Sequence, residues 1–190
     1  MKKLLVVFLV LAMSSFASTV NNYSLDKNHA RLGFSVTHFG ISHVEGNFKE
    51  FSATMNSSKE DFTDAVIEMS ANVNSINTEV EMRDKDLKSD KWFNAEKYPT
   101  ITFKSSSFNK VSDGQYELAG DFTMCGVTKP VVFNAVYNGK AVNPYYKTTS
   151  VGFTITGKLN RTDYKLGGEP LMTGVSDEVE LRSNVEFYVK

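Results

Sequence analysis

The fold of this chain is decided by the stretch DEVELRSNVEFYV at residues 177–189. Its apolar residues stand at alternate positions, and the positions between them carry mostly Glu, Arg and Asn; the apolar set is Val179, Leu181, Val185, Phe187 and Val189. Successive side chains on a strand point to opposite faces of a sheet. The alternation therefore predicts a strand with one dry face and one wet face.

The same period-two pattern recurs along most of the chain. The other segments that carry it are residues 22–26, 30–38, 44–55, 65–73, 100–108, 115–124, 130–137 and 151–159. Their dry faces contain many Phe, Val, Ile and Met residues, which suit strands, and the opposite positions are mostly polar. We therefore predict a single antiparallel sheet with one apolar surface.

Three local signals mark irregularities in this sheet. Val44 and Phe48 share one parity while Phe51 takes the other, which predicts a β-bulge near Glu50. The dipeptides at residues 113–114 and 138–139 are Asp-Gly and Asn-Gly, both common hairpin turns. We predict a turn at each.

Residues 79–95 break the strand pattern. Val80, Met82 or Arg83, and Leu87 have helical spacing, with charged residues between them and no Gly or Pro. We predict one helix or two short ones, whose mixed charges form a solvated face. Trp92 and Phe93 either pack this helix onto the sheet or gate an opening.

A long antiparallel sheet usually removes its exposed edges by curling into a barrel. The predicted fold class is therefore all-β, an antiparallel barrel of about eight strands with a helical insertion. Such a barrel is just wide enough to be filled by its own side chains or to hold one ligand. The residues alone favour the barrel that is filled by its own side chains.

The N-terminus has the features of a cleavable signal peptide. Lys2 and Lys3 precede the apolar residues 4–13, which are followed by Ser15-Phe16-Ala17. This apolar run is shorter than the ~20 residues of a membrane-spanning helix. We predict cleavage after Ala17, which makes residues 1–17 a signal peptide and residues 18–190 one mature, periplasmic or secreted domain.

Charge and cysteine content exclude several classes of protein. The chain carries 21 Lys and Arg against 22 Asp and Glu, so nucleic acid is not an expected partner. It has one cysteine, Cys125, and therefore no internal disulfide. Its stability must come from burial of side chains.

The sequence offers few residues for catalysis or metal binding. Of the three histidines, His38 and His43 flank a short turn without an evident third metal ligand, and Cys125 follows a strand without an evident activating base. No Gly-x-Ser-x-Gly, phosphate-binding loop, paired-cysteine or His-Glu-x-x-His pattern occurs. We predict no catalytic residues, no metal site and no cofactor.

Several sequence blocks, taken in order, resemble one family. They are FSVTHFG at residues 34–40 with VEGNF at 44–48, RD at 83–84 with LKSD at 87–90, WF at 92–93 with YPTITF at 98–103, LAGDFTMCGVTKP at 118–130, and NRTDY at 160–164 with VSDEV at 175–179. Together they are similar to the YceI-like, polyisoprenoid-binding family over nearly the whole mature chain. Cys125 replaces the His common in that hairpin of the family, and Lys165-Leu166 replaces the usual Gly.

The resemblance implies a lipocalin-like barrel whose apolar cavity holds a long isoprenoid or fatty-acyl chain, with transient membrane contact and a homodimer as further expectations. The ligand-binding residues it suggests are wall residues Phe34, Val36, Phe48, Ile67, Met69, Phe103, Phe122, Met124, Phe133, Phe153, Ile155 and Leu181, with His38 and Arg161 at the rim. Arg161 has an equal alternative role, which is to hold its own loop by pairing with an acidic neighbour.

Two functions from different classes follow. The first is an exported protein that carries, stores or sequesters a long-chain amphipathic lipid. The second is a packed-barrel stress-response or protein-interaction module without a bound lipid. An enzymatic role comes third, and it would depend on His38 or Cys125.

Overall fold

The computed structural model describes residues 19–145, 147–168 and 174–189. The predicted signal peptide, residues 1–17, lies outside these ranges. Within them the sheet has eleven strands: β1 (Asn21–Leu25), β2 (Arg31–His38), β3 (Ser42–Phe48), β4 (Phe51–Ser57), β5 (Val66–Asn72), β6 (Ile76–Asn77), β7 (Thr100–Ser112), β8 (Gln115–Met124), β9 (Val127–Val142), β10 (Thr149–Asn160) and β11 (Val175–Val189). In the same ranges, no helix is long and apolar enough to cross a membrane.

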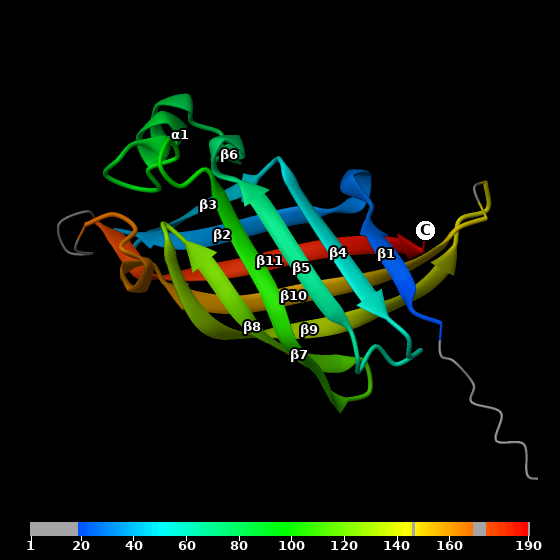
Figure 1. Ribbon diagram of the computed structural model, residues 1–190. Coiled ribbons are helices and arrows are strands. Elements are labelled where there is room, and N and C mark those ends of the chain that lie inside the picture. The colour runs from blue at the N-terminus through cyan, green and yellow to red at the C-terminus, as the bar shows by residue number, and fades with distance from the viewer. Residues whose placement is uncertain (1–18, 146, 169–173, 190) are drawn as a thin grey trace, which may run out of the picture.

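Eight of these strands close into an antiparallel barrel, which confirms the predicted fold class. Their order is β1-β4-β5-β7-β8-β9-β10-β11, and β11 pairs back with β1. The remaining strands, β2, β3 and β6, extend the sheet from β11 at one end of the barrel. Figure 1 shows helix α1 (Glu81–Lys88) at this end, near the connection that follows β10.

Strand β11, which contains the alternating stretch, is the seam of the barrel. It pairs with β10 along one edge, from Asn160 opposite Glu178 to Ser150 opposite Tyr188. On its other edge it pairs first with β2 and then with β1. The short 3₁₀ helix η1 (Lys27–His29) separates β1 from β2, so one strand can close the barrel and also carry the extension.

The closed end of the barrel is filled by its own aromatic side chains. Phe62 and Phe153 pack edge to face, with 5.5 Å between ring centroids, and Tyr137 lies 5.5 Å from Phe153. Phe108 and Tyr116 stack in parallel at 4.5 Å. Edge-to-face and offset pairs of this kind favour a dense interior. This end therefore forms the packed core.

Glycines on inner positions make room for large rings. A Cβ on Gly46 would lie 2.3 Å from Cζ of Phe34, and one on Gly157 would lie 2.2 Å from Cδ1 of Phe133. Real contacts of this kind do not come so close, so any larger residue would displace the ring. The absence of a side chain at these two positions therefore leaves space for the rings of Phe34 and Phe133.

The β-bulge predicted near Glu50 is wrong. The register does change between Phe48 and Phe51, but Lys49 and Glu50 form a bend at which β3 ends and β4 begins, so the strand predicted over residues 44–55 is two strands. The turn predicted at residues 113–114 is confirmed. The turn at residues 113–114 joins β7 to β8, with Gly114 in the left-handed region at φ 68°.

The turn predicted at residues 138–139 is wrong, because β9 continues through it to Val142. Gly139 pairs with Gly152, and Tyr137 pairs with the next residue of β10, Phe153. Asn138 is therefore the extra residue of a bulge. Asn-Gly favours both a hairpin turn and a β-bulge, and the long-range pairing with β10 selects the bulge.

The helix predicted over residues 79–95 is only partly present. Helix α1 ends at Lys88, and the chain then folds back so that the amide N–H groups of Phe93 and Ala95 donate to the carbonyls of Leu87 and Lys88, both at 3.0 Å. These bonds satisfy carbonyls that the end of a helix leaves free. The fold-back places the ring of Phe93 in the core beside Phe48.

Candidate functional site

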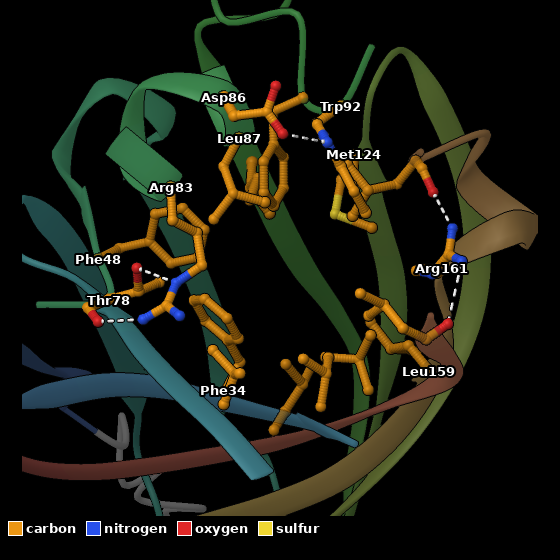
Figure 2. A pocket seen from close by; sticks show the side chains of 18 of the residues that line it. Phe34, Phe48, Thr78, Arg83, Asp86, Leu87, Trp92, Met124, Leu159 and Arg161 are labelled. Atoms are coloured by element: carbon orange, nitrogen blue, oxygen red, sulfur yellow. Dashed lines mark hydrogen bonds between the residues drawn. The ribbon is translucent and has the colours of Figure 1, made fainter. Parts of the chain in front are cut away.

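The main internal cavity lies beneath α1, at the end of the barrel where β2 and β3 extend the sheet (Figure 2). Its volume is about 280 Å³. Apolar side chains form most of its wall, with a few polar groups on the side of α1 and of the 3₁₀ helix η3 (Arg161–Tyr164). Figure 2 shows these side chains converging from opposite elements of the barrel. The lining residues are Phe34, Val36, His38, Val44, Phe48, Thr78, Arg83, Asp86, Leu87, Trp92, Phe93, Ile101, Phe122, Met124, Leu159, Arg161, Leu166, Val175, Val179 and Leu181.

A second, smaller cavity lies deeper in the barrel. Its volume is about 80 Å³, and Ile67, Met69 and Phe133 are among its wall residues. Phe122 and Leu181 line both cavities. These two side chains therefore stand between the two spaces.

The predicted ligand-binding residues divide between these places. The main cavity is lined by Phe34, Val36, His38, Phe48, Phe122, Met124, Arg161 and Leu181. The smaller cavity is lined by Ile67, Met69, Phe103, Phe122, Phe133, Ile155 and Leu181. Phe153 lines neither and belongs to the aromatic cluster of the closed end. Their role in ligand binding stays a prediction.

Several wall residues were not among the ligand-binding residues predicted from the sequence. They come from α1 and its surroundings: Thr78, Arg83, Asp86, Leu87, Trp92 and Phe93. The mixed charges of this segment predict a solvated face. Arg83 nevertheless stands four residues before Leu87, on the same side of the helix, and this spacing was the available signal.

Arg161 is buried, with 1% of its surface exposed. Its guanidinium donates to backbone carbonyls of its own loop and of β11: Nε to Ser176 at 3.0 Å, Nη1 to Leu166 at 2.8 Å and to Gly168 at 2.7 Å, and Nη2 to Val175 at 3.2 Å. The loop-holding role is therefore seen, although the acceptors described are backbone carbonyls and not the acidic neighbour that we expected.

Trp92 and Phe93 do more than pack the helix against the barrel. The indole Nε1 of Trp92 donates to a carboxylate oxygen of Asp86 at 3.0 Å, and Phe93 packs edge to face on Phe48. Both aromatic rings also line the cavity. The segment after α1 thus forms part of the cavity wall.

Arg83 and Thr78 are joined by two hydrogen bonds. Arg83 donates from Nε to the Thr78 hydroxyl at 2.8 Å and from Nη2 to the Thr78 carbonyl at 2.6 Å. The Thr78 hydroxyl and amide in turn donate to one carboxylate oxygen of Asp84, at 2.5 Å and 2.8 Å. This chain of bonds fixes the guanidinium at the cavity wall (Figure 2).

The geometry does not favour catalysis at Cys125. Its thiol lies in the turn between β8 and β9, and burial raises its pKa to about 11. A thiol with this pKa is almost fully protonated near neutral pH and is a poor nucleophile. His38 lines the cavity, whereas the exposed His43 lies on the outer face of the same hairpin. The two imidazoles therefore cannot share one metal ion.

Another polar cluster lies outside the barrel, where β11 changes partners. Asp26, His29 and Glu186 each offer one atom that could bind a metal ion, and these three atoms lie within 4.8 Å of one another. Nδ1 of His29 lies 2.9 Å from a carboxylate oxygen of Asp26, and this bond raises the pKa of His29 and lowers that of Asp26. An ion pair accounts for this cluster.

A closed eight-stranded antiparallel barrel with an apolar cavity under one helix defines a lipocalin-like protein. The chain belongs to the YceI family, since the model of the YceI-like domain matches residues 23–187. Protein YceI of Salmonella arizonae is 32% identical over 190 residues, which cover 98% of this chain and 97% of that protein. A UPF0312 protein of Photorhabdus laumondii is 31% identical over 180 residues, covering 93% and 91%.

Solved structures show the same fold. The YCEI protein of Campylobacter jejuni superposes with a TM-score of 0.72 at 30% identity, covering 81% of this chain and 90% of that one. BcnA of Burkholderia cenocepacia has a TM-score of 0.77 at 20% identity, covering 85% and 98%. A polyisoprenoid binding domain from Saccharophagus degradans has a TM-score of 0.68 at 14% identity, covering 88% and 98%.

Proposed function

We propose that this chain is an exported lipid-binding protein whose cavity holds the apolar chain of a polyisoprenoid, an isoprenoid quinone or a fatty-acyl lipid, for carriage, storage or sequestration. The observation that carries the proposal is the apolar cavity of about 280 Å³ under α1. Each methylene that leaves water contributes roughly 0.8 kcal/mol, so an apolar tail has a strong tendency to occupy such a space. The polyisoprenoid binding of a structural neighbour supports the same ligand class.

The size of the cavity bears on how a long lipid is held. Ligand pockets usually span about 300–1,000 Å³, so the main cavity alone is at the lower limit. The smaller cavity lies beyond Phe122 and Leu181, in the direction in which a tail would continue. We infer that a long chain displaces these two side chains and occupies both spaces.

Uptake of a lipid requires an opening, and α1 is the element best placed to provide one. None of its residues is buried. Its described side-chain bonds run to Thr78 and Trp92. We infer that α1 moves as a lid while the barrel stays closed.

The turn between β2 and β3 supports transient contact with a membrane during uptake. Phe39 and Ile41, at this turn, are 68% and 86% exposed, and the neighbouring His38 lines the cavity. Exposed apolar residues beside the cavity could enter the interface of a bilayer.

The proposal also includes a homodimer, as the family resemblance implies. Light scattering on the purified protein measures the oligomeric state.

Mass spectrometry of the native ligand tests the function. The full-length chain is expressed with its leader, purified without detergent, denatured and extracted with organic solvent. We expect an isoprenoid or fatty-acyl lipid in the extract and none after the same treatment of a secreted protein without a cavity. Repeated recovery of an empty protein that also takes up no added lipid would contradict the proposal.

The cellular address is tested with the same expression strain. We expect the protein in the periplasm or the medium. Its intact mass should be that of a chain whose first residue is Ser18. A version without residues 1–17 serves as the cytoplasmic control. Full-length protein that keeps its leader inside the cell would contradict export.

The packed-barrel alternative has one observation in its favour, which is the aromatic cluster that fills the closed end. It predicts a protein that binds its partner through the outer surface and takes up no lipid. The behaviour of Phe122→Ala separates the two proposals, as argued in the Discussion.

A further inference from the structure

One cation on the cavity wall has a donor that the described protein groups do not use. Arg83 is half-buried, and Figure 2 shows its guanidinium directed from α1 into the cavity beside Phe34. Nε and Nη2 bind Thr78, as described above. Within residues 19–145, 147–168 and 174–189, Nη1 has no hydrogen-bond acceptor, and Arg83 has no ion-pair partner.

The nearest carboxylate in sequence does not neutralise this charge directly. An oxygen of Asp84 instead accepts two bonds from Thr78, whose hydroxyl and carbonyl hold Arg83. Thr78 therefore acts as a spacer that orients the guanidinium. Placing an unpaired charge against apolar side chains is costly unless a partner arrives.

The other polar groups of the wall are differently engaged. Arg161 donates to four backbone carbonyls, and the indole N–H of Trp92 is bound to Asp86. Asp86 is a carboxylate of the wall, but it is exposed and turned toward Trp92 (Figure 2). Arg83 is thus an oriented cation that faces the cavity, and its Nη1 is an unused hydrogen-bond donor among the described residues.

We propose that Arg83 binds the negatively charged head group of the lipid, a carboxylate or a phosphate. This inference rests on the proposed lipid-binding function and names the chemistry of the head. The head lies under α1, where its oxygen accepts from Nη1 in a charge-assisted hydrogen bond. The tail then runs past Phe34 toward Phe122 and Leu181, which line both cavities.

Matched lipid pairs that differ only at the head test this assignment. Fluorescent cis-parinaric acid is compared with its methyl ester at about pH 8, where a free carboxyl group is ionised. Farnesyl phosphate is compared with farnesol by displacement of the fluorescent ester, which distinguishes a phosphate from a carboxylate source. We expect the wild-type protein to bind at least one of the anionic heads about tenfold or more tightly than its neutral partner.

Variants of α1 locate the effect. Arg83→Met should reduce the preference for the anionic head to about one, while the affinity for the methyl ester and farnesol stays within twofold. Arg83→Lys should keep part of the preference, because it retains the charge and loses the planar donors. Lys85→Met, an exposed cation two residues away, should keep all of it.

Two results would overturn the assignment. One is equal binding of charged and neutral heads by the wild-type protein in both pairs. The other is an unchanged preference in Arg83→Met, or in Arg83→Lys if the methionine variant does not fold. Failure of every lipid to bind the wild-type protein would instead contradict the proposed function, so the two failures are distinct.

Discussion

The guanidinium of Arg161 lies over the indole ring of Trp92, with 5.5 Å between Cζ and the ring centroid. This contact joins η3 to the segment that follows α1, two parts of the chain that are far apart in the sequence. A cation over an aromatic face is stabilising, and more so when water is excluded. Together with the carbonyls that Arg161 binds, it fixes the shape of the cavity wall.

Arg161→Met should therefore destabilise the fold strongly. The substitution leaves several buried carbonyls without a donor, and we expect the free energy of unfolding to fall by about 3 kcal/mol. Urea denaturation followed by tryptophan fluorescence measures the loss. Arg182→Met, an exposed arginine on β11, is the matched control and should change stability little. Equal effects of the two variants would contradict a structural role for Arg161.

The alternation in residues 177–189 predicts the strand and its inner face, and its recurrence along the chain predicts the all-β class. It could not show that β11 serves three partners, because pairing over long sequence distances leaves no local signal. In the structure Val179 and Leu181 line the main cavity, while Val185 and Phe187 are buried in the closed part of the barrel. One continuous pattern therefore encodes two different environments.

The candidate site was only partly predictable for a related reason. Apolar wall residues such as Phe34 and Met124 follow the strand period, so they could be named from the sequence. Arg83 lies in a run of mixed charges, and its inward direction depends on Thr78, a residue outside the helix. Polar groups that act through tertiary contacts have no periodic signature.

Phe122→Ala should join the two cavities. The ring is buried and lines both spaces, so its removal should cost about 3–5 kcal/mol and leave a continuous tunnel. We expect relative affinity to shift toward the longer of two fluorescent fatty acids that share one head group. Titration of both probes measures this shift.

Phe108→Ala is the matched control for that experiment. Phe108 is buried at the closed end and lines neither cavity, so the variant should lose similar stability without a change in chain-length preference. The packed-barrel alternative predicts a different result. In that case Phe122→Ala loses stability, and neither the variant nor the wild-type protein binds either probe.

Gly120→Ala should be poorly tolerated because backbone is in the way. A Cβ at this position would lie 2.4 Å from the carbonyl oxygen of Lys104, and a strand cannot move as easily as a side chain. We expect a loss of about 1–3 kcal/mol in chemical denaturation. At Gly152, on β10, the nearest atom to an added Cβ lies at 3.5 Å, so Gly152→Ala should be close to neutral. If Gly120→Ala left the free energy of unfolding unchanged, β7 would have to move away from the added Cβ, which would contradict this prediction.

Asp64 should contribute stability that depends on pH. Its carboxylate accepts from the Ser57 hydroxyl at 2.6 Å, from the hydroxyl and amide of Ser58, and from the Lys59 amide, and these bonds hold its pKa far below the ordinary value. A depressed pKa in the folded state means that the contribution is present above the unfolded value of about 3.9 and is lost as the pH falls below it.

Asp64→Asn tests this sign. We expect the variant to be less stable than the wild type at about pH 7, by about 1 kcal/mol, since the carboxylate is partly exposed. The difference should shrink as the pH falls below about 4, where the carboxyl group of Asp64 begins to protonate in the unfolded wild-type chain while it stays ionised in the folded protein. Denaturation curves over this range measure it. A difference that is constant with pH would contradict the ionised carboxylate as the cause.

Cys125 should react slowly with alkylating reagents in the folded protein. Burial raises its pKa to about 11, so the thiolate fraction near neutral pH is about a hundredfold or more below that of a free cysteine, whose pKa is about 8.5. We expect iodoacetamide labelling, followed by intact mass, to be correspondingly slow in buffer and fast in denaturant. Cys125→Ser gives the background. Equal labelling rates in the folded and unfolded states would mean that the thiol is accessible and ionised, which would restore it as a candidate nucleophile.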